Sequence, residues 1–199
     1  MKFALNIGVQ FKTPEQMFID KIEKSRFTPV SFSKNETKQP FTLTGFNPFK
    51  HCFESTSYKF NPKNKELILM IGAPGSGKTD FVKQYIIKHD YDYVNQDSVK
   101  SKAKCMQIFL KAIEKQKSIV IDNTNYLKKN RMEYVEIALK HSYTVRYLIM
   151  NTNLSLAKHL NYVRHIYSGG KLPLVNNIVY AVYKKNYNAP LIDECSNIE

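Results

Sequence analysis

Residues 72–79 have the side chains and glycine spacing of a phosphate-binding loop. They fit the pattern Gly-x-x-x-x-Gly-Lys-Thr at every position. Glycines in such a loop let backbone N–H groups curl around a phosphate, with Lys78 reaching the β and γ phosphates and the Thr79 hydroxyl available to Mg²⁺. The loop therefore predicts nucleotide binding. The expected binding residues are Gly72, Ala73, Pro74, Gly75, Ser76, Gly77, Lys78 and Thr79.

Two acids follow predicted strands and are candidates for phosphoryl-transfer chemistry. Asp97 follows the second strand and Asp122 follows the third, at the carboxyl ends of parallel strands, where ligands bind. Asp97 is the candidate general base, and Asp122 has the position that orders Mg²⁺ or its waters. Each also has a structural interpretation. Asp97 could cap the following helix, and the turn Asp122–Asn125 could satisfy its own backbone.

A late helix, residues 154–168, supplies two further candidates. Lys158 and Arg164 lie six residues apart on it. Basic residues on such a helix could form a lid that closes over ATP and stabilises the charge of the transition state. The alternative is that they are ordinary exposed cations.

Strands and helices alternate from Glu66 onward, which predicts an α/β domain around a mostly parallel sheet of four to five strands, with helices on both faces. Strands are expected at residues 67–71, 91–95, 118–121 and 144–150. Helices are expected from Gly77 to His89 and at residues 98–116, 128–141, 154–168 and 176–186. Apolar spacing places Val99, Ala103, Met106, Leu110 and Ile113 on the inner side of the second helix, and Met132, Val135 and Leu139 on that of the third.

Residues 1–64 have a different texture from the rest of the chain. Thr13 and Pro14 open a predicted short helix, and residues 31–62 form an aperiodic connector rich in Ser, Thr, Asn and Pro. We therefore expect an irregular N-terminal segment over residues 1–64 and a P-loop domain over residues 65–199.

Composition narrows the class of partner and compartment. A formal net charge of +13 and a pI near 9.5 favour a polyanionic partner, nucleic acid first. The lysine-rich face of residues 98–116 is more typical of a solvated helix than of a nucleic-acid groove. Three scattered cysteines argue against a disulfide framework or a zinc knuckle. No stretch predicts a membrane helix or a secretory leader, so we expect an intracellular protein, nuclear or cytosolic, with no obligate protein partner evident.

Five blocks in order make the chain similar to a known family, the kinase domain of the bifunctional polynucleotide kinase 3′-phosphatases. The blocks are the loop at residues 72–79, Tyr-Val-Asn-Gln-Asp ending at Asp97, Ile-Asp-Asn-Thr-Asn ending at Asn125, residues 157–164, and Leu172-Pro-Leu-Val with residues 183–190. Together they cover about residues 66–190.

The resemblance implies a P-loop kinase fold with a helical lid, and ATP-dependent phosphorylation of a 5′-hydroxyl on DNA or RNA, in nucleic-acid repair. It assigns Lys78 and Thr79 to ATP and Mg²⁺, Asp97 to the general base and Asp122 to the metal side. Arg164 and Lys158 become lid residues on ATP.

The N-terminal residues carry a separate resemblance, because residues 3–18 are similar to the end of the phosphatase domain that precedes the kinase in this family. The phosphatase motif Asp-x-Asp-Gly-Thr is absent from the sequence. We therefore expect residues 1–64 to be a phosphatase remnant and linker, and the chain to lack 3′-phosphatase activity.

Two positions depart from the family pattern. Gln96 stands where the family usually has Arg, a cation near the phosphate of the acceptor strand, and Lys100 could compensate. Tyr162 stands at a usual lid arginine. The missing Arg beside Asp97 keeps open a P-loop kinase for a nucleoside or other small molecule. The net charge of +13 and the remnant N-terminus keep open a nonenzymatic basic nucleic-acid-binding module with a relic P-loop.

Overall fold

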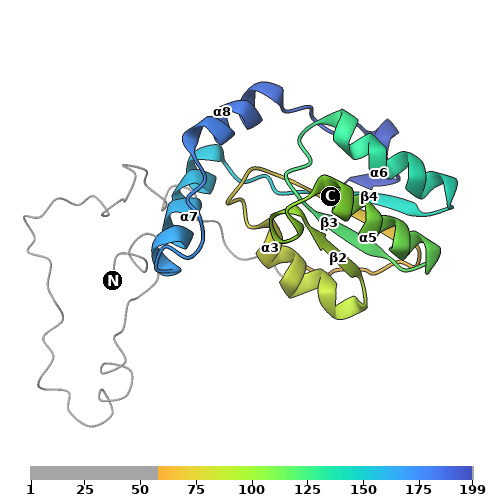
Figure 1. The fold of residues 1–199 in the computed structure, drawn as a ribbon. Coiled ribbons are helices and arrows are strands. Elements are labelled where there is room, and N and C mark those ends of the chain that lie inside the picture. Colours follow the sequence, from red (N-terminus) through yellow and green to blue (C-terminus); the bar gives the residue numbers. More distant parts are fainter. Residues whose placement is uncertain (1–57, 199) are drawn as a thin grey trace, which may run out of the picture. The chain divides into compact units, whose positions relative to one another are not determined.

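The computed structural model describes residues 58–198 (Figure 1). The helix expected at Thr13, the phosphatase-like tail and the connector up to residue 57 lie outside the described residues. Phe60, Asn61 and Lys63 precede the expected P-loop domain and contact Tyr91 or Arg146 within it.

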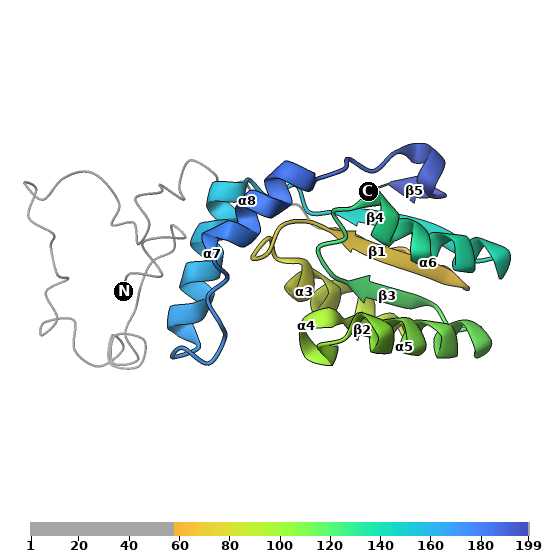
Figure 2. The same cartoon turned by 45° about the horizontal axis from the view of Figure 1, so that its top comes forward.

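A five-stranded sheet forms the centre of this part of the chain. The strands stand in the order β2-β3-β1-β4-β5, and every neighbouring pair is parallel. Figure 2 shows their carboxyl ends directed toward the start of α3 and toward α7. The expectation of a parallel sheet of four to five strands is confirmed. The strands are β1 (Glu66–Ile71), β2 (Asp92–Asn95), β3 (Ile119–Asp122), β4 (Thr144–Ile149) and β5 (Asn197–Ile198).

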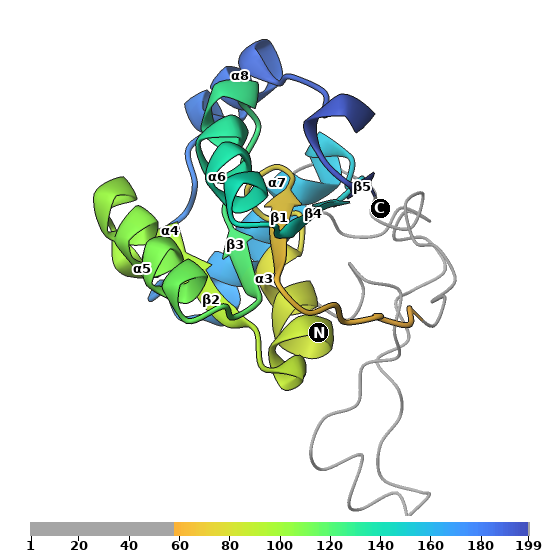
Figure 3. The ribbon, with the colours of Figure 1, turned by 90° about the vertical axis from the view of Figure 1, so that its right-hand side faces the viewer.

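Helices cover both faces of the sheet because the central strand is apolar on both sides. Leu67 and Leu69 share a core with α5 and α6, whereas Ile68 and Met70 share one with the helical segment after the P-loop. All six residues of β1 are buried, as expected for a central parallel strand. In Figure 3, α5 and α6 lie on one side of the strands and the α3 segment on the other.

The helices follow the predicted order with one change at the second. The expected helix at residues 98–116 is divided, because Lys100 adopts a left-handed conformation with φ 57° and Ser101 caps a new helix through its side chain. The helices are α3 (Lys78–Phe81), the π-helical turn η2 (Val82–Ile86), the 3₁₀ turn η3 (Ile87–His89), α4 (Gln96–Val99), α5 (Lys102–Glu114), α6 (Lys128–Lys140), α7 (Leu154–Tyr167), α8 (Asn177–Asn186) and the 3₁₀ turn η4 (Ile192–Glu194).

The predicted inner faces of α5 and α6 are confirmed in part: Ile113 and Val135 are buried, and Val99, Met106 and Met132 pack against the core, but Ala103, Leu110 and Leu139 do not lie on the inner faces. Leu110 and Leu139 are exposed at 39% and 51%. In α5 the spacing was counted from Val99, which belongs to α4, so the division of the helix shifted the face. In α6 the buried set also includes a charged residue that an apolar pattern cannot detect. The buried residues are Cys105, Phe109, Ala112 and Ile113 in α5, and Arg131, Tyr134, Val135 and Ala138 in α6.

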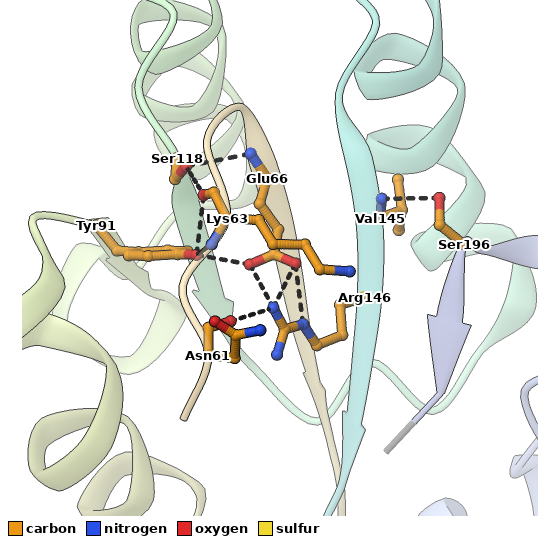
Figure 4. Close-up of polar contacts among 8 residues, drawn as sticks. All are labelled: Asn61, Lys63, Glu66, Tyr91, Ser118, Val145, Arg146 and Ser196. Atoms are coloured by element: carbon orange, nitrogen blue, oxygen red, sulfur yellow. Dashed lines mark hydrogen bonds and ion pairs between the residues drawn. The ribbon is translucent and has the colours of Figure 1, made fainter. Parts of the chain in front are cut away.

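A buried ion pair joins β1 and β4 near the amino end of β1, which is the end away from the P-loop (Figure 4). The Arg146 guanidinium donates to both carboxylate oxygens of Glu66 at 2.7 and 2.9 Å. Tyr91 donates its hydroxyl to the same carboxylate at 2.6 Å. Arg146 also donates to the carbonyl of Asn61 and stands over the ring of Phe60. Residues that precede the expected boundary at residue 64 therefore contribute to this packing.

A second buried ion pair secures the end of the described chain. Arg131 on α6 donates to Glu194 at 2.9 Å and to the carbonyls of Asn125 and Asn188. Burial by itself raises the pKa of Glu194, but the hydrogen bonds and charge of Arg131 outweigh it, so the pKa lies below its usual value. This contribution to stability is present above the carboxyl's ordinary pKa and is lost as the pH falls below it.

Among the helices at residues 58–198, none is both long enough and apolar enough to cross a membrane.

Candidate active site

The P-loop lies between β1 and α3, with two of its glycines in conformations that other residues rarely adopt. Gly77 has φ 92° and precedes the first residue of α3. Gly75 has φ 75°, and a Cβ atom there would lie 2.4 Å from the carbonyl oxygen of Ala157 on α7. Glycine at position 75 therefore satisfies both the turn and the close approach of a neighbouring helix.

Lys78 is buried inside the loop that it belongs to. Its ammonium donates to the carbonyls of Gly72 and Ala73 at 2.9 and 2.8 Å and contacts the hydroxyl of Ser76 at 3.4 Å. Burial lowers the pKa of Lys78 to about 8. The negative charges of Asp122 and Asp97 act in the opposite direction, and the positive charge of Arg164 lowers the pKa further. The Lys78 charge is therefore held where an incoming phosphate would offer it new partners.

Asp122, at the end of β3, collects three hydrogen bonds on one carboxylate oxygen. Oδ2 accepts from the hydroxyl of Thr79 at 2.6 Å, the hydroxyl of Tyr93 at 2.8 Å and the amide of Asn95 at 2.9 Å. Burial, and then the bond to Asp122, raise the pKa of Tyr93 above its usual value. The two residues predicted on the metal side, Thr79 and Asp122, are thus in direct contact.

Asp97 lies in the first turn of α4 and is exposed. The N-cap of α4 is Asn95, whose side chain accepts from the N–H of Ser98, so the alternative role of Asp97 as a helix cap is wrong. Within residues 58–198 no hydrogen bond holds the Asp97 carboxylate. It is near enough to Lys78 to influence the pKa of that residue.

The turn after β3 also contributes to the side of the site that carries Asp97. Asn123 donates its side-chain amide to the Gln96 oxygen and accepts the N–H of Thr124 at 2.7 Å. The self-satisfied turn considered for Asp122 is therefore made by Asn123 instead. Lys100 ends α4 and is exposed.

α7 and α8 pack on the P-loop from beyond the ends of the strands (Figure 2). On α8, Tyr180 donates to the carbonyl of Pro74 at 3.0 Å, and the Lys158 ammonium lies 5.5 Å from the centre of the Tyr180 ring. Arg164 is exposed on α7, contacts Asn161 at 3.4 Å, and helps to lower the pKa of Lys78. Both expected lid residues thus lie on a helix that contacts the P-loop. Of the two, it is Arg164 whose charge acts on the loop's lysine.

A family model described as AAA domain matches residues 67–176, from the first strand to the segment before α8. The chain belongs to this family. The match includes the P-loop, Asp97, Asp122 and the two cations of α7, which are all the candidate site residues.

Two curated relatives confirm the resemblance to the polynucleotide kinase 3′-phosphatases. The chain is 46% identical, over 97% of its length, to a protein of Acanthamoeba polyphaga mimivirus provisionally named a bifunctional polynucleotide phosphatase/kinase. It is 32% identical, over its whole length, to the bifunctional polynucleotide phosphatase/kinase of Schizosaccharomyces pombe. It spans 45% and 46% of the lengths of these relatives.

The fold is also similar to that of Kti12 from Chaetomium thermophilum, solved with ADP-AlF3. The TM-score is 0.52 at 16% identity, covering 66% of this chain and 86% of the other. This similarity concerns the fold alone, and the expected P-loop kinase fold is confirmed.

The residues of this AAA domain site suit a magnesium ion held jointly with a nucleotide. Mg²⁺ in kinase sites takes one or two carboxylates together with substrate phosphates. Thr79 and Asp122 offer a hydroxyl and a carboxylate in contact with one another. At residues 58–198, no group of three or more His, Cys, Asp or Glu side chains could hold a metal by itself. The donors thus fit an ion that arrives with a nucleotide.

The lowered pKa of Lys78 predicts a pH-dependent affinity for ATP. Below pH 8 the ammonium is charged in the free AAA domain, and phosphates would stabilise it further. As the pH rises through about 8 the free lysine becomes neutral, so the Kd for ATP should increase, approaching tenfold per pH unit above that point. Titration calorimetry from about pH 7 to pH 9.5 measures this. A Lys78→Arg variant, charged throughout, should show no slope, and a flat wild-type profile would contradict the prediction.

Three site residues have contacts that their sequence positions did not reveal. Tyr93 and Asn95 bond to Asp122, and Asn123 bonds to Gln96. Tyr93 and Asn95 are two residues apart, so they lie on the same face of β2, near the carboxyl end of the strand. This spacing of polar groups in the sequence could have indicated that both reach the site.

Proposed function

We propose that this chain is an ATP-dependent kinase that phosphorylates the 5′-hydroxyl end of a polynucleotide. The observation that carries the proposal is the contact between Thr79 and Asp122 at the P-loop, with the exposed Asp97 at the end of the neighbouring strand. The site therefore has residues suited to the phosphate donor and, beside them, a carboxylate that no hydrogen bond holds within the described residues. The names of the two curated relatives support a polynucleotide as the acceptor.

In the proposed reaction each residue acts on a stated atom. The 5′-oxygen attacks the γ-phosphorus of ATP while Asp97 accepts the hydroxyl proton, and the bond from γ-phosphorus to the bridging oxygen breaks to release ADP. Lys78 binds the β and γ phosphates. Thr79 and Asp122 would hold Mg²⁺, which would neutralise charge on the phosphate oxygens. Arg164 and Lys158 support the phosphates from α7.

The charge of α7 and α8 supports a polyanionic substrate. Residues 154–186 contain no Asp or Glu, so no acid of this segment offsets its cations. A polynucleotide bound partly through such cations releases counterions, and its affinity falls steeply with salt. The cations are Lys158, Arg164, Lys171, Lys184 and Lys185.

The experiment is a transfer assay with radiolabelled ATP and Mg²⁺ on matched DNA and RNA oligonucleotides that carry a 5′-hydroxyl or a 5′-phosphate. We expect label only on the 5′-hydroxyl acceptors, with a KM for the acceptor that rises with salt. A chelator should abolish transfer. Equal labelling of oligonucleotides already phosphorylated at the 5′ end would contradict the proposed reaction.

Two results would favour the alternative functions instead. Faster transfer to nucleosides than to oligonucleotides, with little effect of salt, would indicate a small-molecule kinase. Salt-sensitive binding of oligonucleotides that ATP does not alter, with no turnover, would indicate a binding module.

We further propose a role in nucleic-acid repair and an absence of 3′-phosphatase activity, the latter because the Asp-x-Asp-Gly-Thr motif is missing. A 3′-phosphorylated oligonucleotide in the same assay should remain intact.

A further inference from the structure

We propose that Asn95 is a positioning residue whose side-chain amide couples Asp122, on the donor side, to the helix that carries Asp97. The proposal rests on the proposed function for the roles of Asp122 and Asp97. The amide does not touch a reacting atom. It acts through the two acids that it joins.

The orientation of the Asn95 amide is set by its partners. Asn95 ends β2, is buried, and stands opposite Asp122 in the parallel register. Its oxygen accepts from the backbone N–H of Ser98 at 3.0 Å, and that group can only donate. The NH₂ group is therefore directed at Asp122, where it lies 2.9 Å from Oδ2. A carboxylate or a hydroxyl at position 95 could also cap α4. However, an ionised carboxylate has no hydrogen to donate to Asp122, and a serine hydroxyl is too short to reach it while it caps the helix.

Asp122 receives three donors on one oxygen, which leaves the other available. In the described part of the chain, no hydrogen bond involves Oδ1, whereas Oδ2 accepts from Thr79, Tyr93 and Asn95. Donors of this kind orient a metal-binding carboxylate, and their removal commonly costs ten- to a hundredfold in metal affinity or activity. Tyr93 lies two residues before Asn95, so it reaches Asp122 from the same face of β2.

The other end of the bridge is the short helix α4, whose last residue, Val99, packs against the core. α4 has four residues, and its start is tied to the end of β3 by Asn95 to Asp122 and by Gln96 to Asn123. Asp97 lies in its first turn. Removing the Asn95 amide should therefore loosen the orientation of Asp122 and the placement of Asp97 together.

The decisive variant is Asn95→Ser, because serine caps a helix about as well as asparagine but cannot reach Asp122. We expect kcat to fall about tenfold or more, and the Mg²⁺ concentration for half-maximal ATP binding to rise about tenfold. ATP binding measured in chelator should stay unchanged. Asn95→Ala, which removes the cap as well, should be less stable than Asn95→Ser yet show the same kinetic defect. Asn176→Ser makes the same substitution at the cap of α8 and should leave kcat and the Mg²⁺ dependence at wild-type values.

Two results would overturn the coupling. One is an Asn95→Ser variant with wild-type kcat and Mg²⁺ dependence. The other is a defect confined to Asn95→Ala, which would mean that only the cap matters. Adding Tyr93→Phe to Asn95→Ser should cost less than the product of the two single effects, because both donors act on one oxygen. Calorimetry with ATP and Mg²⁺ needs no acceptor, so the Asp122 half of the bridge is tested even if no polynucleotide is phosphorylated.

Discussion

Replacing Asp97 by Asn should reduce the rate of phosphate transfer by about 10²- to 10⁴-fold, the usual contribution of a positioned general base. The substituted amide has nearly the same shape as the carboxylate but cannot accept the proton of the 5′-hydroxyl. The carboxylate is exposed and does not cap α4, so the free energy of unfolding should change by less than about 0.5 kcal/mol. Single-turnover transfer to a 5′-hydroxyl oligonucleotide measures the rate. Calorimetry of ATP with Mg²⁺ should give an affinity close to wild type.

The matched control for Asp97→Asn is Asp193→Asn, the same substitution at another exposed acid, in η4. It should transfer phosphate at the wild-type rate. An Asp97→Asn protein that transfers phosphate within about twofold of the wild-type rate would remove Asp97 from the proposed mechanism, because the loss of a general base reduces the rate by far more than twofold.

Replacing Arg146 by Met should destabilise the protein by about 3–5 kcal/mol, because it leaves the Glu66 carboxylate buried without its cation. Both side chains are almost completely buried, at 3% and 0% exposure. Such a loss is a large fraction of the ~5–15 kcal/mol that stabilises a typical domain. The chain has no tryptophan, so urea unfolding is best followed by far-ultraviolet circular dichroism.

Two comparisons separate burial from charge in this prediction. Lys102→Met removes the exposed ion pair between Lys102 and Glu133, and it should cost only about 0–1 kcal/mol. The double variant Glu66→Leu with Arg146→Met should recover part of the stability lost in Arg146→Met, since no buried charge remains. A loss below about 1 kcal/mol in Arg146→Met would show that Tyr91 and its neighbours satisfy the carboxylate without the cation.

The part of the site that suits the phosphate donor, the P-loop, could be predicted from local sequence. A P-loop is a strand, a glycine turn and a helix start within a few residues, so residues 72–79 predict its conformation directly. Asp97 and Asp122 were located by a similar rule, because the carboxyl ends of parallel strands share one edge of a sheet. The strands and most helices lay where apolar spacing placed them, since that spacing reflects burial on a sheet or helix face.

What the sequence could not decide is which distant side chains meet. The bridge from Asn95 to Asp122 joins residues 27 positions apart, and the pair of Glu66 and Arg146 joins residues 80 apart. The break at Lys100 moved the inner face of α5. Asn95 is the cap of α4, and within residues 58–198 no hydrogen bond holds the Asp97 carboxylate. Sequence alone therefore determined the phosphate-binding loop and the edge of the sheet that carries the acids. Only the packed structure determined the partners of Asp122, because long-range pairing depends on strand order and register rather than on neighbouring residues.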